Sequence, residues 1–397
     1  MWVAVIGGRL QGLEAAYLAK KAGMHVLLID KNEDIPALKI ADNFICMDAG
    51  SKEKLVSVIK NVDLIFPALE NGRVLHSLAA TAEFLKIPFA FDLKAYQISA
   101  SKRRSDLLFA DIGIPAPGYF PDCAFPLIAK PSEASGSEGV VCLGNESDLK
   151  KFRHSLKDKV SEWVIQEYLE GPSYSIEVLG YRGHYLPIQV TDLEMDALYD
   201  CKRVLAPSGL STSLRKKFAE IAVKIAAEIS LNGIMDVEVI LHNDQLKVLE
   251  IDARLPSQTP TAVYHSSGVN MLELMAEAFI NGRLPEPEEI TEKKFAIFEH
   301  ISISPGRLEI SGEHVVASAG PLDHLEEFFG ADEALTNYRS GRDNWMATLI
   351  IIGANREEAF IKRSGVIRQI CSKHSIDTYL DPIPPDRGFR SMEGAGS

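Results

Sequence analysis

Two neighbouring runs of the sequence alternate acidic and apolar residues. The first, IMDVEVILH over residues 234–242, carries Asp236 and Glu238, and the second, LKVLEID over residues 246–252, carries Glu250 and Asp252. Side chains of a β-strand point alternately to its two faces, so each run has one apolar and one acidic face. We expect the runs to form a hairpin that turns at residues 243–245, with Glu238 opposite Glu250 and Asp236 opposite Asp252.

This pairing creates a row of carboxylates that needs a neutralising partner. In the expected register His242 faces Leu246, and directly opposed residues lie roughly 4.5–5.5 Å apart at Cβ, where like charges repel. An acidic outer face is one interpretation, although a solvent-exposed strand normally includes lysines. We favour a divalent cation, because Mg²⁺ binds a few carboxylates together with substrate phosphates. Arg254, just past the acids, has a planar fork suited to phosphate or carboxylate oxygens.

The first ninety residues alternate strands with helices. Strands are expected at WVAVIGG, HVLLID, DLIFPAL and PFAF, and helices at LEAAYLAKKAG, KLVSVIKNV and HSLAATAEFLKI. Such alternation predicts a parallel sheet with right-handed crossovers, whose ligands bind at the carboxyl ends of the strands.

The turn GGRLQG after the first strand has three interpretations. A dinucleotide-binding fingerprint reads G-x-G-x-x-G, with an acid about twenty residues later. Asp30 fits the acid, but Arg9 stands where the middle glycine belongs. A tight packing turn and a substrate-binding turn are the alternatives, and all three stay open at this point.

The middle of the chain contains candidate phosphate-binding residues, although it has no P-loop motif. Lys130 ends the strand FPLIAK, and the small residues of SEASGSEG after it allow backbone N–H groups to fold over an anion. Lys102 and Lys202 are further candidates, although each is more often a solvated surface lysine. The strand WVIQEYL runs into a break at Gly171, and its backbone is a candidate for reading an adenine edge.

Bulk properties exclude several classes of protein. A net charge of −13 argues against a general nucleic-acid binder. No run of eighteen apolar residues is present to span a bilayer. The five cysteines are scattered and form no CxxC pair, which fits a reducing cytoplasm. The tail over residues 381–397 lacks an apolar period and is predicted to be disordered.

Six segments, in this order, resemble the ATP-grasp carboxylate–amine ligases: SKRRSDLLFADIGIPAP, LIAKPSEASGSEGV, VIQEYLEG, YDCKRVLAPSGL, MDVEVIL and LEIDARLPSQTP. The resemblance covers most of the chain through about residue 281. It implies a mixed α/β and α+β architecture, the ATP-grasp fold with an N-terminal Rossmann-like domain over residues 1–95. A linker helix and a lid with a glycine-rich loop would follow over 96–174, and a catalytic domain over 175–380.

The resemblance also implies roles for individual residues. Those that match the nucleotide-binding positions are Lys102, Lys130, Ser135, Gly136, Ser137, Glu167, Tyr168 and Leu169. Lys202 and Arg254 match catalytic positions near the transferred phosphate, and the metal ligands would be Glu238, Glu250 and Asp252.

Two positions depart from the family pattern. Asp252 stands where the family usually has Asn, which adds negative charge to the ligand set. Ser173 stands where many members have a ribose-binding Glu, so the ribose contact is unassigned. Glu177 shares the alternating face of Ser173 and Ser175, and we assign it to substrate or ribose.

The segments WVAVIGGRLQGLEAAYLAKKAG and IFPALENGRVL resemble, more narrowly, the ligases of pyrrolysine biosynthesis, which join 3-methyl-D-ornithine to L-lysine. This resemblance implies a cytoplasmic enzyme that uses ATP and Mg²⁺, forms an amide through an acyl phosphate, and accepts D-ornithine. Leu10, Gln11 and Glu70 would bind the amino-acid groups of lysine. The implied partners are small amino acids, not nucleic acid or membrane, and homodimers are common among relatives.

Two functions of other classes remain open. An NAD-dependent oxidoreductase built on the first domain would transfer hydride and would not need ATP. A nucleotide-binding regulatory protein would bind the nucleotide with the same residues but would not catalyse a reaction. The retained acids argue against a regulator, because a sensor has less need of metal-assisted phosphoryl transfer.

Overall fold

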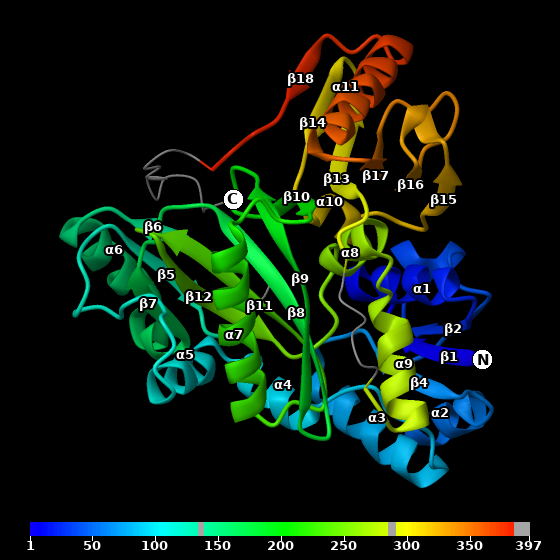
Figure 1. Ribbon diagram of the computed structural model, residues 1–397, viewed down its shortest axis with the longest axis horizontal. Helices are drawn as coiled ribbons and strands as arrows, with labels where there is room; N and C mark the ends of the chain where they lie inside the picture. The colour runs from blue at the N-terminus through cyan, green and yellow to red at the C-terminus, as the bar shows by residue number, and fades with distance from the viewer. Residues whose placement is uncertain (134–138, 285–290, 385–397) are drawn as a thin grey trace.

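The computed structural model describes residues 1–133, 139–284 and 291–384. The chain forms an N-terminal α/β domain, a small lid and a C-terminal part built on one continuous sheet (Figure 1). Within the described ranges, no helix is both long and apolar enough to cross a membrane.

The N-terminal domain is a four-stranded parallel sheet in the order β3-β2-β1-β4. Its elements are β1 (Trp2–Ile6), α1 (Leu10–Lys21), β2 (His25–Asp30), the 3-10 helix η1 (Pro36–Lys39), β3 (Asn43–Cys46), α2 (Lys52–Ile59), β4 (Leu64–Pro67) and α3 (Gly72–Leu85). The strand predicted at PFAF is wrong, because Phe89 makes only an isolated bridge to Ile65. The fourth strand is β3, whose four residues we had not expected to be extended.

The lid is a three-stranded antiparallel sheet reached through two linker helices. These elements are α4 (Leu93–Ser99), α5 (Lys102–Asp111), β5 (Leu127–Pro131), β6 (Val141–Leu143), α6 (Glu146–Leu156), the 3-10 helix η2 (Lys157–Glu162) and β7 (Trp163–Glu167). The linker was expected to be one helix but breaks after Ser99, so that Lys102 begins α5. The N–H of Lys102 donates to the carbonyl of Ser132 at 2.9 Å, which brings this lysine beside lid strand β5.

The C-terminal part contains an eleven-stranded sheet with a main path in the order β12-β11-β8-β9-β10-β13-β17-β16-β15. Its first half is β8 (Ser173–Tyr181), β9 (His184–Met195), β10 (Cys201–Ala206), α7 (Thr212–Glu228), β11 (Gly233–His242), β12 (Gln245–Asp252), α8 (Thr259–Ser267) and α9 (Met271–Asn281). Its second half is β13 (Phe295–Ser304), β14 (Arg307–Ile310), α10 (His314–Ala317), β15 (Asp323–Glu326), the 3-10 helix η3 (Phe328–Gly330), β16 (Glu333–Thr336), β17 (Trp345–Gly353), α11 (Arg356–Lys373) and β18 (Thr378–Leu380).

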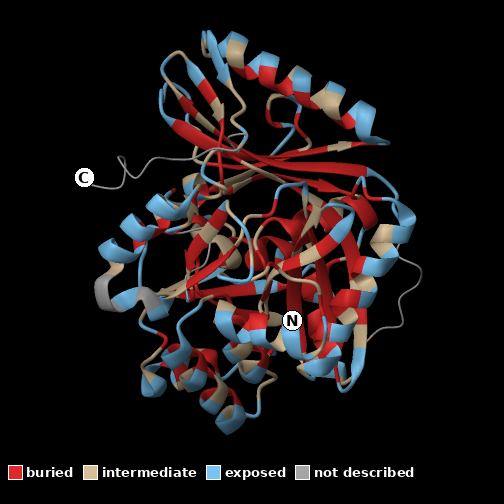
Figure 2. Cartoon of the chain, turned by 90° about the vertical axis from the view of Figure 1, so that its left-hand side faces the viewer, coloured by how far each residue is buried: buried red, intermediate tan, exposed pale blue. Residues whose placement is uncertain are grey.

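Helices α7 and α11 cover this sheet through apolar stripes. Phe218, Ile221 and Ile225 of α7 are buried at helical spacing over β8 and β9. Val366 and Ile370 of α11 are buried in the same way, in the cluster that includes the apolar residues of β13 and β17. Figure 2 shows the strands buried through the middle of the molecule, under helices with exposed outer faces.

The N-terminal domain is held against the C-terminal part by a polar contact as well as by apolar packing. The Tyr17 hydroxyl of α1 donates to Glu333 on β16 at 2.7 Å, and the Lys21 ammonium contacts the same carboxylate at 2.7 Å. His324 also bonds to Glu333, at 2.5 Å. These partners outweigh the effect of burial and lower the pKa of Glu333 to about 2.

The hairpin of the two acidic runs forms, with one correction to its register. Glu238 lies opposite Glu250 and Asp236 opposite Asp252, as expected. The turn, however, pairs His242 with Gln245 rather than Leu246, and a β-bulge between Glu238 and Val239 restores the register. The two turn residues, Asn243 and Asp244, both have positive φ, as a two-residue hairpin turn requires.

Candidate functional site

The carboxylate row spans three strands rather than two. β8 pairs with β11 and places Ser175 opposite Glu238 and Glu177 opposite Asp236. The acidic face of the hairpin therefore continues onto β8, and the apolar side chains of the same strands pack under α7. Alternation along each strand is what separates the two faces.

The carboxylate row carries more negative charge than the neighbouring lysine and arginine side chains can neutralise. Burial, together with the facing Glu250 and Asp252, raises the pKa of Glu238 to about 8. Burial also raises the pKa of Asp252 to about 6, against the effect of Arg254. Asp236 is buried with its Oδ1 lacking a hydrogen-bond partner among the described residues, and its pKa is raised well above the ordinary value by burial and by Asp252. This set of oxygens fits a hard divalent cation.

Glu250 differs from its neighbours because lysines reach it. The Lys102 ammonium lies 3.0 Å from the Glu250 carboxylate. Burial alone would raise the pKa of Glu250, but Lys102 and Lys130 hold it below the ordinary value. Lys130 is itself almost fully buried, and desolvation lowers its pKa. Two lysines thus approach the row from the linker and the lid.

A cavity of about 160 Å³ separates the lid from the carboxylate row. Five of the residues predicted to bind nucleotide border it: Lys102, Lys130, Glu167, Tyr168 and Leu169. Glu238 and Glu250 border it as well, together with Ser173, at the position that lacked a ribose ligand. The structure therefore brings the predicted lysines, hinge residues and acids to one place.

Within the hinge, most polar groups are already engaged. The Glu167 carboxylate contacts the Lys247 ammonium at 2.6 Å and accepts from the N–H of Gly118. The N–H of Tyr168 donates to the carbonyl of Pro126 at 3.2 Å. Of the three hinge residues, Leu169 is the one whose N–H has no partner among the described residues. Backbone groups, rather than the Glu167 side chain, are left to bind a base.

Two predicted residues are not brought to the cavities. Lys202 is buried, and its ammonium contacts Asp381 at 2.6 Å and the carbonyl of Pro382. Asp381, in the tail expected to be disordered, also pairs with Arg203.

Glu177 lies in the carboxylate row but is fully buried and borders no cavity around the row. Burial raises the pKa of Glu177 to about 7. The loop residues Ser135, Gly136 and Ser137 lie outside the described residues.

The three residues predicted to bind lysine border a second cavity, of about 220 Å³. Gln11 donates to the Glu70 carboxylate at 2.7 Å, and Leu10 lies beside them at the start of α1. Arg254 joins this cavity to the carboxylate row, because its guanidinium contacts Glu70 at 2.8 Å and Asp252 at 2.9 Å. The N-terminal domain and the sheet that carries the carboxylate row thus meet at Arg254.

A smaller cavity of about 90 Å³ lies between the first two. It borders the carboxylate row, including Asp236 and Glu238. Four residues line both this cavity and the one at Gln11: Asp200, Arg254, Ser257 and Glu313. The three cavities therefore form one series that runs from the lid to the N-terminal domain.

The turn GGRLQG packs tightly against its surroundings. Gly7 has φ of +104°, and a Cβ there would lie 2.3 Å from the carbonyl oxygen of Ala68. The Asp30 carboxylate accepts from the N–H groups of Gly8 and Asn32, each at 2.9 Å. Asp30 therefore holds the loop in place, which favours the packing turn over a ribose-binding acid of a dinucleotide site.

Several cavity residues could not be recognised in the sequence. Asp200 adjoins the predicted Lys202, but Glu313 and His314 follow β14, far from any motif. The Glu313 carboxylate accepts from the Ser257 hydroxyl at 2.6 Å and the Gln258 amide at 2.9 Å. The pairing of β13 with both β10 and β14 brings the start of α10 to the start of β10.

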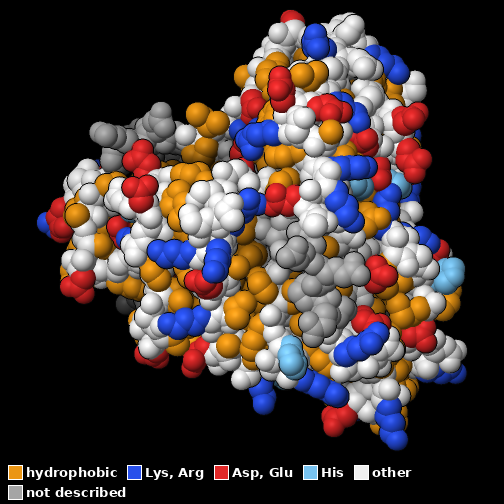
Figure 3. Space-filling view, viewed as in Figure 1, with side chains coloured by type: hydrophobic (Ala, Val, Ile, Leu, Met, Phe, Trp, Pro, Cys, Tyr) orange, Lys and Arg blue, Asp and Glu red, His pale blue; other side chains and the backbone are white. Residues whose placement is uncertain are grey.

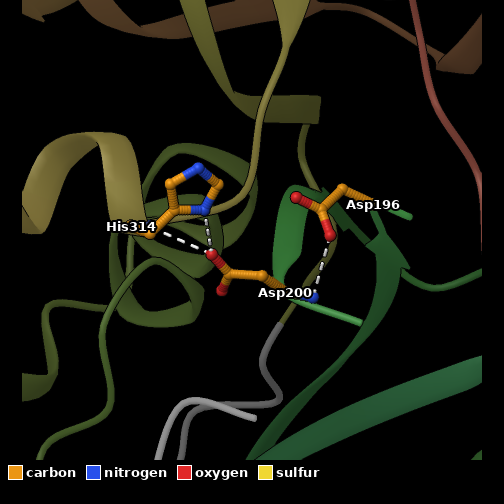
Figure 4. A group of neighbouring side chains, drawn as sticks. All are labelled: Asp196, Asp200 and His314. Carbon is orange, nitrogen blue, oxygen red and sulfur yellow. Dashed lines mark hydrogen bonds and ion pairs between the residues drawn. The ribbon is translucent and has the colours of Figure 1, made fainter. Parts of the chain in front are cut away.

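His314 and two aspartates form a compact group (Figure 4). The Nδ1 of His314 bonds to the Asp200 carboxylate at 2.6 Å, and the N–H of His314 donates to the same oxygen at 3.0 Å. Asp196 accepts from the N–H groups of Leu198 at 2.7 Å and Asp200 at 3.1 Å. The ligand atoms lie within 4.8 Å of one another, but the direct contact between Asp200 and His314 and the amide donors already account for this spacing.

Charges are mixed on the outer surface. On the described part of the face shown in Figure 3, basic and acidic side chains are interspersed.

Comparison with known proteins gives matches along most of the chain. The family model for the ATP-grasp domain matches residues 101–258, and that for the PylC-like N-terminal domain matches residues 3–88. The 3-methyl-D-ornithine–L-lysine ligase of Methanosarcina mazei is 39% identical over 364 residues, 91% of this chain and 93% of the relative. That of Methanosarcina acetivorans is 39% identical over 369 residues, 92% of this chain and 96% of the relative.

A solved structure supports the fold. The biotin carboxylase domain dimer of Hydrogenobacter thermophilus 2-oxoglutarate carboxylase, in complex with MgADP, ADP and bicarbonate, superposes with a TM-score of 0.70 at 16% identity. The match covers 92% of this chain and 89% of that chain. At this identity the likeness bears on the fold alone.

Proposed function

Because the chain belongs to the ATP-grasp family and, within it, to the 3-methyl-D-ornithine–L-lysine ligases, we propose that it joins the carboxylate of 3-methyl-D-ornithine or D-ornithine to the ε-amine of L-lysine. The reaction consumes ATP and serves pyrrolysine biosynthesis. The observation that carries the proposal is the series of three adjoining cavities, which offers one place each for nucleotide, carboxyl donor and amine.

ATP occupies the cavity under the lid. Adenine lies at the hinge, where the N–H of Leu169 is the donor left to it, and the phosphates extend toward Lys102 and Lys130. Mg²⁺ held by Glu238, Glu250 and Asp252 would neutralise the charge that builds up on the transferred phosphoryl group. Asp236 Oδ1, which is buried and has no hydrogen-bond partner in the described part of the chain, and the raised pKa of Glu238 support a cation there.

The carboxyl donor binds in the middle cavity, beside the carboxylate row. Its carboxylate attacks the γ-phosphorus of ATP, which forms the acyl phosphate and releases ADP. Arg254 faces this point with a guanidinium already oriented by Asp252 and Glu70, so it is placed to hold the acyl phosphate. The acid Glu313 at the other end of the cavity is suited to an amino group of a diamino acid.

L-Lysine binds in the cavity at Leu10, Gln11 and Glu70, with its ε-amine toward the middle cavity. The ε-amine attacks the acyl carbon, the amide bond forms, and phosphate leaves. A free ε-ammonium has a pKa of about 10.4, so it must lose a proton before it attacks.

The test is product formation with defined substrates. Purified protein with ATP, Mg²⁺, D-ornithine and L-lysine is expected to release phosphate only when both amino acids are present, and to yield a product with the mass of a dipeptide. NADH-dependent turnover without ATP would instead identify the oxidoreductase, and Mg·ATP binding without phosphate release would identify a regulatory protein.

A further inference from the structure

The pair formed by His314 and Asp200 lies on the wall of the amine cavity and has no part in the reaction described so far. His314 is half-exposed and borders the cavity together with Gln11 and Glu70. Its Nδ1 and its backbone N–H both bond to one oxygen of Asp200. Because the carboxylate accepts from Nδ1–H, the imidazole carries its proton on Nδ1 and leaves the Nε2 lone pair available. Nε2 points away from both aspartates (Figure 4).

The surrounding chain holds Asp200 closely in place. Asp196 accepts from the N–H groups of Asp200 and of Gly312, which fixes both ends of the contact. A Cβ on Gly312 would lie 2.2 Å from the Asp200 oxygen, so the close approach needs glycine at this position. Both residues line the amine cavity, but Asp200 is largely buried and His314 is half-exposed. Asp200 therefore orients the more exposed imidazole.

The other titratable groups on this cavity wall are engaged differently. Glu70 is paired with Arg254 and accepts from Gln11. One oxygen of Glu313 already accepts from Ser257 and Gln258. Within the described residues, Nε2 of His314 makes no hydrogen bond, so this nitrogen can accept a proton from a substrate in the cavity.

We propose that His314 is the general base that deprotonates the ε-ammonium of the lysine acceptor, and that Asp200 is the positioning residue that orients its imidazole. The proposal rests on the proposed function and concerns its second step. Asp200, which also lines the middle cavity, places the base beside the junction where amine and acyl phosphate meet.

Nε2 of His314 takes one proton from the ε-ammonium, and the resulting imidazolium is stabilised by the Asp200 carboxylate. The amine lone pair forms the new bond to the acyl carbon, and the bond from that carbon to the phosphate oxygen breaks with its electron pair. The second proton leaves the nitrogen and is taken up by the departing phosphate. An amide, hydrogen phosphate and a protonated His314 result.

A general base is needed only by an acceptor that must first lose a proton. An acceptor that is already uncharged therefore distinguishes general-base catalysis by His314 from a structural role. Hydroxylamine is mostly uncharged at pH 7 and converts an acyl phosphate to a hydroxamate. With ATP, Mg²⁺ and D-ornithine, His314→Gln is expected to form hydroxamate at the wild-type rate but to form the lysine amide about 100-fold more slowly or worse, the usual scale of general-base catalysis. Asp200→Asn should show the same selective loss, and His184→Gln, at an exposed histidine, should show none.

Added imidazole is expected to restore part of the lysine amide rate in His314→Ala. Equal loss of hydroxamate and amide in the His314 and Asp200 variants, or wild-type amide rates in both, would overturn the proposal. Wild-type protein that forms no hydroxamate with ATP and D-ornithine would defeat the proposed function itself. The two failures are therefore distinguishable.

Discussion

Glu250 illustrates how neighbouring side chains assign different roles to chemically similar acids. Lys102 and Lys130 keep its pKa low, whereas burial raises that of the facing Glu238 to about 8. Glu250 is therefore the acid of the row that stays ionised without a metal. A hard cation would bind there first and then displace the proton held at Glu238.

For this reason Glu250→Gln is expected to lower phosphate release by about two orders of magnitude, the scale of losing one group that stabilises transition-state charge. The circular dichroism spectrum should not change, because glutamine keeps the shape of the side chain. Glu220→Gln, at an exposed position of α7, serves as the control. Full activity in Glu250→Gln would show that the metal assignment is wrong.

Lys202 is the residue for which sequence and structure disagree most. Its match to the family motif predicts a place near the transferred phosphate, but its ammonium contacts Asp381 and the carbonyl of Pro382. Breaking a fully buried ion pair costs roughly 3–5 kcal/mol. Asp381 is partly exposed and keeps Arg203 when Lys202 is removed, so we expect Lys202→Met to lower the free energy of unfolding by less than this amount while ATP affinity is retained.

Thermal unfolding and the KM for ATP measure the two effects separately. Asp381→Asn should destabilise by more, because it leaves the buried Lys202 and Arg203 without this carboxylate. If Lys202→Met kept wild-type stability and lost turnover, the catalytic role implied by the motif would be the correct one.

At the scale of elements, the hairpin of β11 and β12 determines where the acids lie. Its turn residues Asn243 and Asp244 have φ of 49° and 60°, a conformation that disfavours residues with a Cβ. The bulge next to Glu238 absorbs the residue by which this short turn shifts the pairing. The acids therefore stay opposed although the turn is shorter than the sequence suggested.

Glycine at position 244 should relieve this strain without moving the acids. We expect Asp244→Gly to stabilise the protein by roughly 0.5–1 kcal/mol, since glycine adopts positive φ without steric cost. Differential scanning calorimetry would show a higher Tm, and Mg·ATP turnover should be unchanged. A lower Tm would mean that the Asp244 side chain contributes more than its backbone strain costs.

At the scale of the whole molecule, the carboxylate row couples stability to pH and to ligand. The pKa of Glu238 is raised to about 8 and that of Asp252 to about 6, so the folded state holds protons that the unfolded chain has lost. Stability from these groups is therefore present below the ordinary carboxyl pKa and is lost as pH rises toward 8.

Mg·ADP reverses this loss, because the cation replaces the protons. We expect the Tm of the ligand-free protein to fall between pH 5 and pH 8, and the affinity for Mg·ADP to rise by up to about tenfold per pH unit for each proton displaced. Isothermal titration calorimetry in buffers of different ionisation enthalpy would count those protons. An affinity independent of pH would contradict the cation at the row.

Domain boundaries at residues 95, 174 and 380 and the expected homodimer remain predictions. The solved relative described above is a domain dimer, which is a property of that protein. Analytical ultracentrifugation of this chain would decide its own oligomeric state.

The sequence by itself determined the acidic and apolar faces of β11 and β12, because alternation along a strand is a local property. It also predicted a nucleotide site at Lys102, Lys130 and the hinge from a family resemblance, and these residues border one cavity. Only the tertiary structure decided which residues share a cavity. Glu313 and His314 at the start of α10 are distant in sequence from Asp200 before β10, and sheet pairing brings them together, while Lys202 and Glu177 are turned or buried away from the cavities. Contacts between distant segments depend on packing, and no local pattern records them.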